Sequence, residues 1–476
     1  MNHAPPLPAT DETIARFATI VGETHALRAP DLLAPYLTEP RDLFKGRTRL
    51  VLRPDSTAEV AAIMKLASET RTPIVPQGGN TGLVGGQSPR SEAEIVLSLS
   101  RMNRIRDVDA VGRTMVVEAG TILANVQAAA DEAGLLFPLS LGSEGSCEIG
   151  GNLSSNAGGT SVLAYGNARD LCLGLEAVLP SGEILPGLRR LKKDNRGYDW
   201  KDLLIGAEGT LAVITGAVLK LFPKPAGREV AYVGLRSPEK ALRLLGRAEA
   251  RAGRQLTAFE LMGRRGMEFT LRHTPGARDP LSSAHAWYLL VEISSQRSAE
   301  DARETMEAIL AAALEEALIE DAAIAQSLAD AATFWKMREA MSWAQKPEGG
   351  SIKHDVAVPV ARVAEFLAAA DAAVLTAIPE ARIVAFGHLG DGNIHYNISQ
   401  PLGADKAAFL ARWTEINAIV HGIVDGMDGT FSAEHGIGQL KRLELARTKN
   451  SVEMALMRSL KQALDPYQIL NPGKVV

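Results

Sequence analysis

Residues 76–86 read PQGGNTGLVGG, with five glycines in eleven positions, directly after a short strand predicted over residues 72–77. Glycine lets the backbone take positive φ, and successive free N–H groups then form a concave anion site suited to a pyrophosphate. No G-K-[ST] follows, and the glycines do not have G-x-G-x-x-G spacing, so neither standard nucleotide loop is present. The stretch predicts an α/β unit that holds a cofactor; a mobile surface loop is the alternative.

The chain around this loop reads as two α/β stretches. Over residues 48–100 the order is strand, helix, strand, glycine-rich loop and strand, and the helix is capped by Asp55 or Ser56. Over residues 107–222, strands at 114–120, 174–180 and 210–222 accompany a helix at 122–134. Between them lies an irregular stretch rich in Gly, Ser and Asn, residues 142–159, and such a long loop inside a domain is usually functional.

After a domain boundary predicted at residues 223–227, the pattern changes to strands alternating with long amphipathic helices. Strands at 229–235 and 255–262 enclose a helix at 238–253, and a strand at 285–293 precedes a helix at 298–317. This order predicts a ferredoxin-like domain with an antiparallel sheet. Two further strands, 382–388 and 393–399, are joined by a tight turn, and a helix at 451–465 precedes a Pro/Gly-rich tail.

Composition limits the classes of function. A chain of 476 residues exceeds the size of one hydrophobic core, so two or more domains are expected. The net charge of -5 and the lack of a basic stripe argue against a nucleic-acid partner. Two cysteines fit a reducing compartment. The N-terminus has no signal-like apolar run and no long apolar stretch occurs, which predicts a cytoplasmic protein without an integral membrane segment.

Three potential metal ligands are His388, His395 and Glu434. His395 and Asn397 differ by two positions and share one face of a strand, and the turn at 389–392 returns the chain beside His388. Two imidazoles and a carboxylate suit zinc, and also manganese, iron or cobalt. The spacing H-x6-H is not diagnostic, so structural or surface roles stay open. A metalloprotease is disfavoured because H-E-x-x-H is absent.

His435 directly follows Glu434. A metal lowers the pKa of a bound hydroxyl, and a neutral imidazole accepts a proton near neutral pH. His435 is therefore the candidate general base, with a capping or packing role as the alternative.

Five motifs carry a resemblance to a known family. Three of them resemble the flavin-binding motifs of the vanillyl-alcohol-oxidase-type FAD family: PQGGNTGLVGG (76–86), GSCEIGGNLSSNAGG (145–159) and GAEGTLAVIT (206–215). Two resemble the C-terminal motifs of its D-2-hydroxyacid dehydrogenase branch: GHLGDGNIH (387–395) and SAEHGIG (432–438). The match keeps this order over residues 36–476.

The resemblance implies an α+β fold with three parts. A PCMH-type FAD-binding domain of two subdomains, split near residue 103, covers residues 1–225. A ferredoxin-like cap or substrate domain covers 226–430, and a short helical segment, 431–476, returns to the flavin.

The resemblance also implies the contacts of the cofactor. The backbone of residues 78–81 would hold the FAD pyrophosphate, and Ile214 would touch the cofactor through its backbone. Neither glycine-rich stretch contains a histidine, so non-covalent FAD is expected. The residues expected at the cofactor are Pro76, Gln77, Gly78, Gly79, Asn80, Thr81, Gly82, Gly85, Gly86, Leu141, Gly142, Ser146, Gly150, Gly151, Asn156, Gly158, Ile214, Glu434 and Asn471.

In the dehydrogenase branch, the residues that correspond to His388, His395 and Glu434 are metal ligands. Arg338 and Lys353 match positions that bind a substrate carboxylate, as suits an anionic substrate. The substrate set is completed by Ser342, one helical turn beyond Arg338, and by Asn397 and His435. Two positions depart from the family pattern: Ser342 replaces a threonine, and His354 replaces a tyrosine.

The expected reaction is oxidation of a D-2-hydroxyacid to the 2-oxo acid, with D-2-hydroxyglutarate giving 2-oxoglutarate, by proton abstraction from the hydroxyl and hydride transfer to flavin N5. Lys353 is the main reason to favour a dicarboxylate. Alternatives are a D-lactate, D-malate or glycolate dehydrogenase of the same fold, an oxygen-using flavin oxidase, and a flavin-binding protein without chemistry. The resemblance suggests an electron-transfer flavoprotein or a quinone as acceptor, and we expect a homodimer.

Overall fold

The computed structural model describes residues 7–476, which fold into two compact units. Unit 1 contains residues 7–159, 166–223 and 434–476, and unit 2 contains residues 160–165 and 224–433. The division proposed from the sequence did not include residues 160–165 in the second part. They belong there because the short helix α6 (Val162–Tyr165) packs against β13 (Leu256–Gly263).

The first sheet of unit 1 carries the glycine-rich loop. Its strand order is β1-β2-β4-β3, and β4 pairs in parallel with both β2 and β3. Helix α3 begins after Ser56, whose Oγ accepts a hydrogen bond from the Glu59 N–H at 3.3 Å, so Ser56 rather than Asp55 is the cap. The elements are α1 (Asp11–Val21), β1 (Ala26–Leu27), α2 (Pro30–Leu33), β2 (Val51–Leu52), α3 (Thr57–Thr70), β3 (Ile74–Gln77) and β4 (Ile95–Ser98).

The second sheet of unit 1 is antiparallel, in the order β5-β6-β10-β8-β9. A separate two-stranded pairing joins β7 to β11. The elements are β5 (Ile105–Asp109), β6 (Thr114–Glu118), α4 (Leu123–Glu132), β7 (Leu135–Leu136), α5 (Ile149–Ser154), β8 (Cys172–Val178), β9 (Ile184–Gly187), α7 (Trp200–Leu204), β10 (Val213–Lys220) and β11 (Phe222–Pro223).

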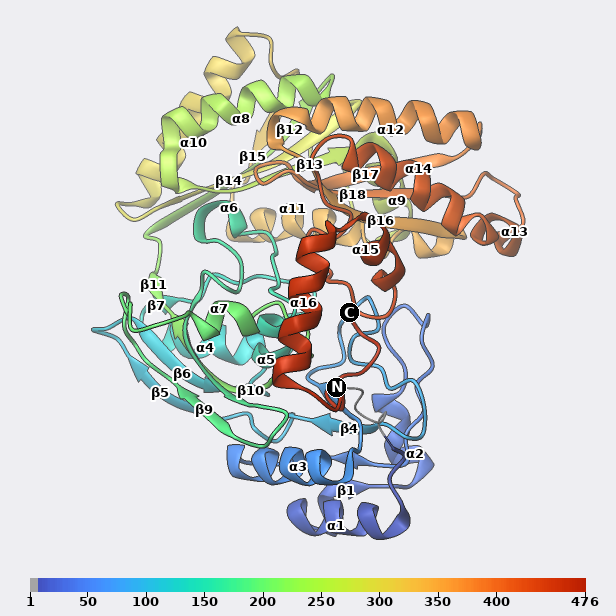
Figure 1. Cartoon of the computed structure of the whole chain (residues 1–476). Coiled ribbons are helices and arrows are strands. Elements are labelled where there is room, and N and C mark those ends of the chain that lie inside the picture. Colours follow the sequence, from blue (N-terminus) through green and yellow to red (C-terminus); the bar gives the residue numbers. More distant parts are fainter. Residues whose placement is uncertain (1–6) are drawn as a thin grey trace. The chain divides into compact units, whose positions relative to one another are not determined.

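The C-terminal segment of unit 1 returns to the first sheet, as Figure 1 shows in red. It contains α15 (Arg442–Thr448) and α16 (Ser451–Leu464). After α16 the chain pairs with β3: the Ile74 N–H donates to the Ile469 carbonyl at 2.8 Å, and the Asn471 N–H donates to the Ile74 carbonyl at 2.8 Å. The tail is therefore attached to the strand that leads into the glycine-rich loop.

Unit 2 is built on one seven-stranded antiparallel sheet, in the order β15-β12-β14-β13-β17-β18-β16. Its first four strands and two helices have the ferredoxin-like β-α-β-β-α-β arrangement. The elements are β12 (Gly227–Leu235), α8 (Pro238–Ala252), β13, α9 (Arg264–His273), β14 (Trp287–Ser295), α10 (Ala299–Glu315), β15 (Asp321–Ile324), α11 (Leu328–Ala340), β16 (Ser351–Ala357), α12 (Val363–Ala377), β17 (Arg382–His388), β18 (Asn393–Ser399), α13 (Lys406–Ala411) and α14 (Trp413–Asp425).

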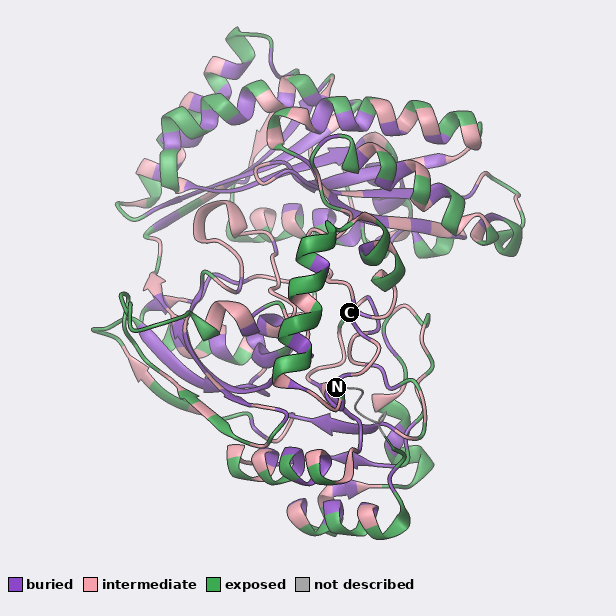
Figure 2. Ribbon diagram, in the orientation of Figure 1, coloured by how far each residue is buried: buried purple, intermediate pink, exposed green. Residues whose placement is uncertain are grey.

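Helices cover both faces of this sheet (Figure 1). On one face, side chains of α8, α10, α12 and α14 form a large apolar core with the strands. On the other, α9 and α11 enclose a smaller core that includes Tyr232, Met262 and Phe386. Figure 2 shows the strands buried between these helices.

The α+β class and the ferredoxin-like motif predicted from the sequence are confirmed. Strand β16 was not predicted, although it belongs to the edge of the sheet that carries the candidate site. In its sequence, SIKHDVA, the polar His354 stands between Ile352 and Val356, so it interrupts the apolar half of the alternation expected of a half-buried strand. Among residues 7–476, none of the helices combines the length and the apolar run needed to cross a bilayer.

Candidate active site

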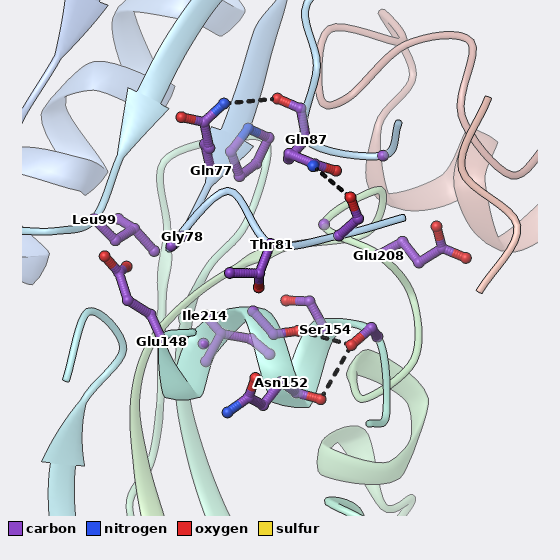
Figure 3. Close-up of a pocket in the computed structure, with 18 of the residues that line it drawn as sticks. Gln77, Gly78, Thr81, Gln87, Leu99, Glu148, Asn152, Ser154, Glu208 and Ile214 are labelled. Carbon is purple, nitrogen blue, oxygen red and sulfur yellow. Dashed lines mark hydrogen bonds between the residues drawn. The ribbon is translucent and has the colours of Figure 1, made fainter. Parts of the chain in front are cut away.

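The glycine-rich loop forms one wall of a pocket in unit 1. Figure 3 shows the loop from Gly78 to Thr81 facing helix α5 and Ile214. Of the residues expected at the cofactor, those that line the pocket are Pro76, Gln77, Gly78, Gly79, Asn80, Thr81, Gly82, Gly86, Gly150, Gly151 and Ile214.

The backbone of the loop has the properties of an anion site. The N–H groups of residues 78–82 donate no hydrogen bond to any other described residue. Asn80 takes a left-handed φ of 55°, and its Nδ2 donates to the carbonyls of Pro35 at 3.0 Å and Thr38 at 2.8 Å. The Asn80 side chain thus fixes the loop from outside and leaves the backbone to the pocket. Successive free N–H groups fit the diphosphate of FAD.

Gly79 is packed too tightly to carry a side chain. A Cβ at this position would overlap the carbonyl oxygen of Ser146. We expect Gly79→Ala to displace the loop and to reduce the FAD content of the purified protein by at least about tenfold, through loss of the fixed donors. Flavin absorbance per protein, with circular dichroism as a check on folding, measures this. In the control Gly145→Ala, the new Cβ meets no atom within 4 Å, so full FAD content is expected.

Two further residues of unit 1 line the pocket: Glu208, which precedes β10, and His435 of the C-terminal segment. The Glu208 carboxylate accepts hydrogen bonds from the N–H groups of Ile437 at 2.7 Å and Gly438 at 2.8 Å. Burial raises the pKa of Glu208, against the lowering effect of these two donors. Asn471 Nδ2 donates to the carbonyls of Gly86 at 3.1 Å and Glu208 at 2.8 Å. The two residues that bond to Glu208, Ile437 and Gly438, closely follow His435 in the chain, so their contacts hold His435 at the pocket.

The remaining residues expected at the cofactor lie outside the lining of this pocket: Gly85, Leu141, Gly142, Ser146, Asn156, Gly158, Glu434 and Asn471. Asn156 Oδ1 accepts a hydrogen bond from the Arg169 N–H at 3.0 Å. Glu434 Oε2 accepts from the Gly159 N–H at 3.3 Å, and its Oε1 lies 3.6 Å from His435 Nε2. The structure adds Glu148 and Glu208 to the lining. Neither was predicted, although both stand within the two later motifs, because their position at the pocket depends on how distant segments fold together.

In unit 2, strand register places four predicted residues on one face of the sheet. Residues directly opposite in neighbouring strands project from the same face. His395 pairs with Asp355, and Asn397 pairs with Lys353, across β18 and β16. The ring centroids of His388 and His395 are 5.6 Å apart. The structure thus brings His388, His395, Asn397 and Lys353 together and adds the buried carboxylate of Asp355.

A buried glutamate, Glu260 of β13, joins the predicted metal residue to the predicted substrate residue. Its Oε1 lies 2.7 Å from His388 Nδ1, and its Oε2 accepts from Arg338 Nε at 2.8 Å. Burial alone would raise the pKa of Glu260, but His388 and Arg338 lower it to about 2. Because the Glu260 carboxylate contacts Nδ1 of His388, the other ring nitrogen, Nε2, is the atom whose lone pair is available to a metal.

Arg338 is almost completely buried, and its guanidinium also lies over the Phe386 ring, 4.8 Å from the centroid. The Phe386 ring in turn lies 5.1 Å from that of His395. Arg338 is therefore fixed by a carboxylate and an aromatic face rather than left in solvent. Glu260 was not predicted from the sequence, because it stands alone in the apolar strand TAFELM, far in sequence from its partners.

Ser342 does not continue helix α11, which ends at Ala340. The prediction that it lies one helical turn beyond Arg338 is corrected, because the chain passes into a turn after Met341. The carbonyl oxygen of Ser342 accepts a hydrogen bond from Lys353 Nζ at 2.9 Å. His354 points to the other face of β16, where its Nδ1 lies 2.9 Å from the Tyr396 carbonyl. The departure from the family at His354 is thus on the face away from Lys353.

Comparisons with known proteins identify the two units. A family model described as the C-terminal domain of FAD-linked oxidases matches residues 224–475, and an FAD-binding domain model matches residues 48–186. A D-2-hydroxyglutarate dehydrogenase of Xanthomonas citri pv. viticola is 38% identical over 448 residues, covering 92% of this chain and 93% of that protein. The mitochondrial D-2-hydroxyglutarate dehydrogenase of Arabidopsis thaliana is 37% identical over 463 residues, covering 97% of this chain and 81% of that protein.

The prediction of a cytoplasmic protein is contradicted by these comparisons. The relatives from Arabidopsis thaliana, Bos taurus and Danio rerio are named as mitochondrial enzymes, whereas the name of the Xanthomonas relative gives no compartment. The absence of a recognisable targeting pattern at the N-terminus was not a sufficient basis for that prediction.

Among solved structures, p-cresol methylhydroxylase with bound substrate superimposes with a TM-score of 0.78 at 15% identity, over 99% of this chain and 98% of that chain. A likeness at this identity concerns the fold alone, and that fold is the PCMH-type FAD-binding fold. Family models over residues 48–186 and 224–475, and sequence relatives that cover 92% and 97% of this chain, agree with it. The chain belongs to the FAD-linked oxidases with the vanillyl-alcohol-oxidase-type flavin fold, and it is an FAD-dependent dehydrogenase of their D-2-hydroxyacid branch.

Proposed function

We propose that this enzyme oxidises D-2-hydroxyglutarate to 2-oxoglutarate with the help of FAD and a divalent metal. The observation that carries the proposal is the buried array of Arg338, Glu260 and His388, with Lys353 on the same sheet face as the histidines. It combines a fixed cation for a carboxylate with imidazoles suited to a metal. A 2-hydroxyacid needs both, because its carboxylate and hydroxyl stand on neighbouring carbons.

The proposed metal ligands are His388, His395 and Glu434. Glu260 supports this set, since its contact with Nδ1 of His388 leaves Nε2 for a metal. Glu434 directly follows Ala433, whose N–H donates to the Asp355 carbonyl at 3.2 Å in unit 2. Two imidazoles and a carboxylate fit zinc, with manganese, iron and cobalt as the other choices. When bound, the metal polarises the substrate hydroxyl and lowers its pKa.

His435 is the proposed general base. It lines the cofactor pocket of unit 1, and the contacts of Glu208 with Ile437 and Gly438 fix the backbone that follows it. Its imidazole takes the hydroxyl proton as the C2 hydrogen leaves. FAD, when bound, accepts that hydrogen as hydride. The free N–H groups of residues 78–82 hold its diphosphate, and no histidine of either glycine-rich stretch is available for a covalent link.

Arg338, Ser342, Lys353 and Asn397 are the proposed substrate contacts, together with His435. The second cation, Lys353, favours a dicarboxylate over D-lactate, because the extra carboxylate requires a partner. The names of the relatives from Arabidopsis thaliana and Xanthomonas citri support the same choice. Reoxidation of FAD is proposed to occur through an electron-transfer flavoprotein or a quinone, and the assembly is proposed to be a homodimer.

Anaerobic bleaching of the flavin by a panel of hydroxyacids tests the substrate. We expect D-2-hydroxyglutarate to reduce the flavin at least about tenfold faster than the monocarboxylates D-lactate and glycolate at equal concentration, since one paired carboxylate is worth at least that factor. D-malate, which also has two carboxylates, shows the effect of a chain that is one carbon shorter. The L-enantiomer of 2-hydroxyglutarate serves as the control and should leave the flavin oxidised. Stopped-flow absorbance gives the rates.

Faster bleaching by D-lactate would refute the dicarboxylate assignment and leave a D-lactate dehydrogenase of the same fold. Turnover with oxygen at the rate seen with an artificial dye acceptor would instead identify an oxidase. A flavin that none of the acids bleaches would show that the protein binds FAD without this chemistry.

A further inference from the structure

The wall of the cofactor pocket contains one acidic side chain without an assigned role. Glu148 lines the pocket and is only 6% exposed, and its Oε2 has no hydrogen-bond partner among the described residues. This oxygen lies 3.4 Å from the position that a Cβ on Gly78 would occupy. Figure 3 shows the carboxyl group of Glu148 directed toward Gly78. A buried polar atom of this kind lacks a partner that a ligand would supply.

The position of Glu148 indicates which part of the cofactor it faces. Gly78 is the first of the five loop residues whose N–H groups are free, so the carboxyl group lies beside the end of the proposed diphosphate site. The backbone N of Gly151 lies 3.6 Å from the same Cβ position on Gly78. His435 and Glu208, at the reactive side of the pocket, come from other segments of unit 1. Glu148 is thus adjacent to the anionic part of FAD rather than to the reacting atoms.

A charged carboxylate at this position would repel a diphosphate. Burial is the sole cause acting on Glu148, and it raises the pKa to about 8, so the group is a neutral acid at pH 7. The other titratable side chains that line the pocket are Glu208 and His435, and Glu144 and Cys147 precede Glu148 in its own segment. A neutral carboxylic acid has an O–H group, which is a hydrogen-bond donor.

We propose that Glu148, in its protonated form, donates a hydrogen bond from its carboxyl group to a diphosphate oxygen of FAD and thereby acts as a binding residue for the cofactor. The inference rests on FAD binding but not on the proposed substrate or metal. It makes a proton part of the binding site: the protein takes FAD with Glu148 protonated, and loss of that proton places two negative groups in contact. Cofactor affinity is therefore highest below the pKa of Glu148 and falls as the pH rises through it.

Titration of the deflavinated full-length protein with FAD tests the proposal. Flavin fluorescence gives the dissociation constant at pH values from about 6 to about 10. For the unaltered protein, we expect it to rise above pH 8 by up to about tenfold per pH unit, as linkage to one proton requires. Glu148→Gln retains an N–H donor at every pH, so it should bind FAD as the unaltered protein does at pH 7 and should lose the alkaline weakening.

Two further variants complete the comparison. Glu148→Ala removes the donor and should weaken FAD binding at pH 7 by about 10- to 100-fold. Glu144→Gln, in the same segment, should keep the alkaline weakening, because Glu144 contacts Gln127 instead of lining the pocket. His435 and Glu208 are present in every variant, so any effect they have on the pH dependence of FAD binding is the same in all of them and cancels in the comparison. Circular dichroism confirms that each variant is folded.

Either of two results would overturn the proposal. An affinity that is independent of pH, with Glu148→Gln and Glu148→Ala equal to the unaltered protein, would show that Glu148 does not touch the cofactor. An affinity that rises with pH, with Glu148→Gln as weak as Glu148→Ala, would show that a carboxylate accepts a hydrogen bond from a hydroxyl or amine of the cofactor instead. A protein that binds no FAD at any pH would contradict the flavoenzyme assignment itself and is thus distinguishable from both.

Discussion

His435→Asn should retain FAD and metal but reduce its flavin with D-2-hydroxyglutarate about 10²- to 10⁴-fold more slowly, which is the usual loss when a positioned general base is removed. Asparagine is similar in size to the imidazole and keeps a polar group at the pocket, yet it cannot take a proton near neutral pH. The contacts of Glu208 with the Ile437 and Gly438 backbone do not involve the imidazole, so the loop should stay in place. Anaerobic stopped-flow absorbance measures the rate.

The pH profile of the same reaction separates catalysis from packing. The flavin reduction rate of the unaltered enzyme should fall as the pH drops through the pKa of its base. The residual rate of His435→Asn should not show this decrease at low pH. His25→Asn is a suitable control, because His25 belongs to unit 1 but does not line the pocket. Near-normal flavin reduction in His435→Asn would reject the assigned role.

The second large effect concerns the metal. His388→Ala should bind the metal at least about 100-fold more weakly. Loss of a residue that only hydrogen-bonds to a metal ligand typically lowers metal affinity by about 10- to 100-fold, and loss of the ligand itself should cost more. It also leaves the buried Glu260 carboxylate without one of its two partners, so a lower melting temperature is expected. Elemental analysis after gel filtration measures the metal, and flavin absorbance should remain unchanged, since the FAD loop belongs to unit 1.

Treatment of the unaltered enzyme with EDTA should reproduce the loss of activity, and added zinc, manganese or cobalt should restore it. His285→Ala provides the control, because His285 is a buried histidine of unit 2 whose carboxylate partner is Glu320 instead of Glu260. An active, EDTA-resistant enzyme that contains no metal would remove the metal from the mechanism.

The sequence predicted those parts of the site that depend on local rules. Two-residue periodicity places His395 and Asn397 on one strand face, and the tight turn before them returns the chain beside His388, as the register of β17 and β18 bears out. Glycine spacing predicted the loop of residues 76–86, and its free N–H groups agree with an anion site. In each case the relevant residues lie within one turn or one strand of each other.

The parts that were missed depend on pairing between distant segments. Glu260 meets His388 only because β13 lies next to β17 in the sheet, and no local pattern specifies that neighbour. Glu148 stands in a glycine-rich stretch, but its lack of a partner is a property of the folded pocket. The end of α11 before Ser342 was also misjudged, because element boundaries depend on the last turn of a helix more than on its periodicity.

The attachment of the C-terminal tail to β3 has a consequence for biosynthesis. Asn471 bonds to the Gly86 carbonyl across 385 positions of chain, and the segment that carries it is translated long after the loop of residues 76–86. A domain made early in synthesis usually folds before the later ones emerge from the ribosome. Here the flavin-binding unit is interrupted by the whole of residues 224–433 and receives its last strand-like segment afterwards. The flavin pocket is therefore complete only once the C-terminal segment has been translated, because His435 lines the pocket and the tail pairs with β3.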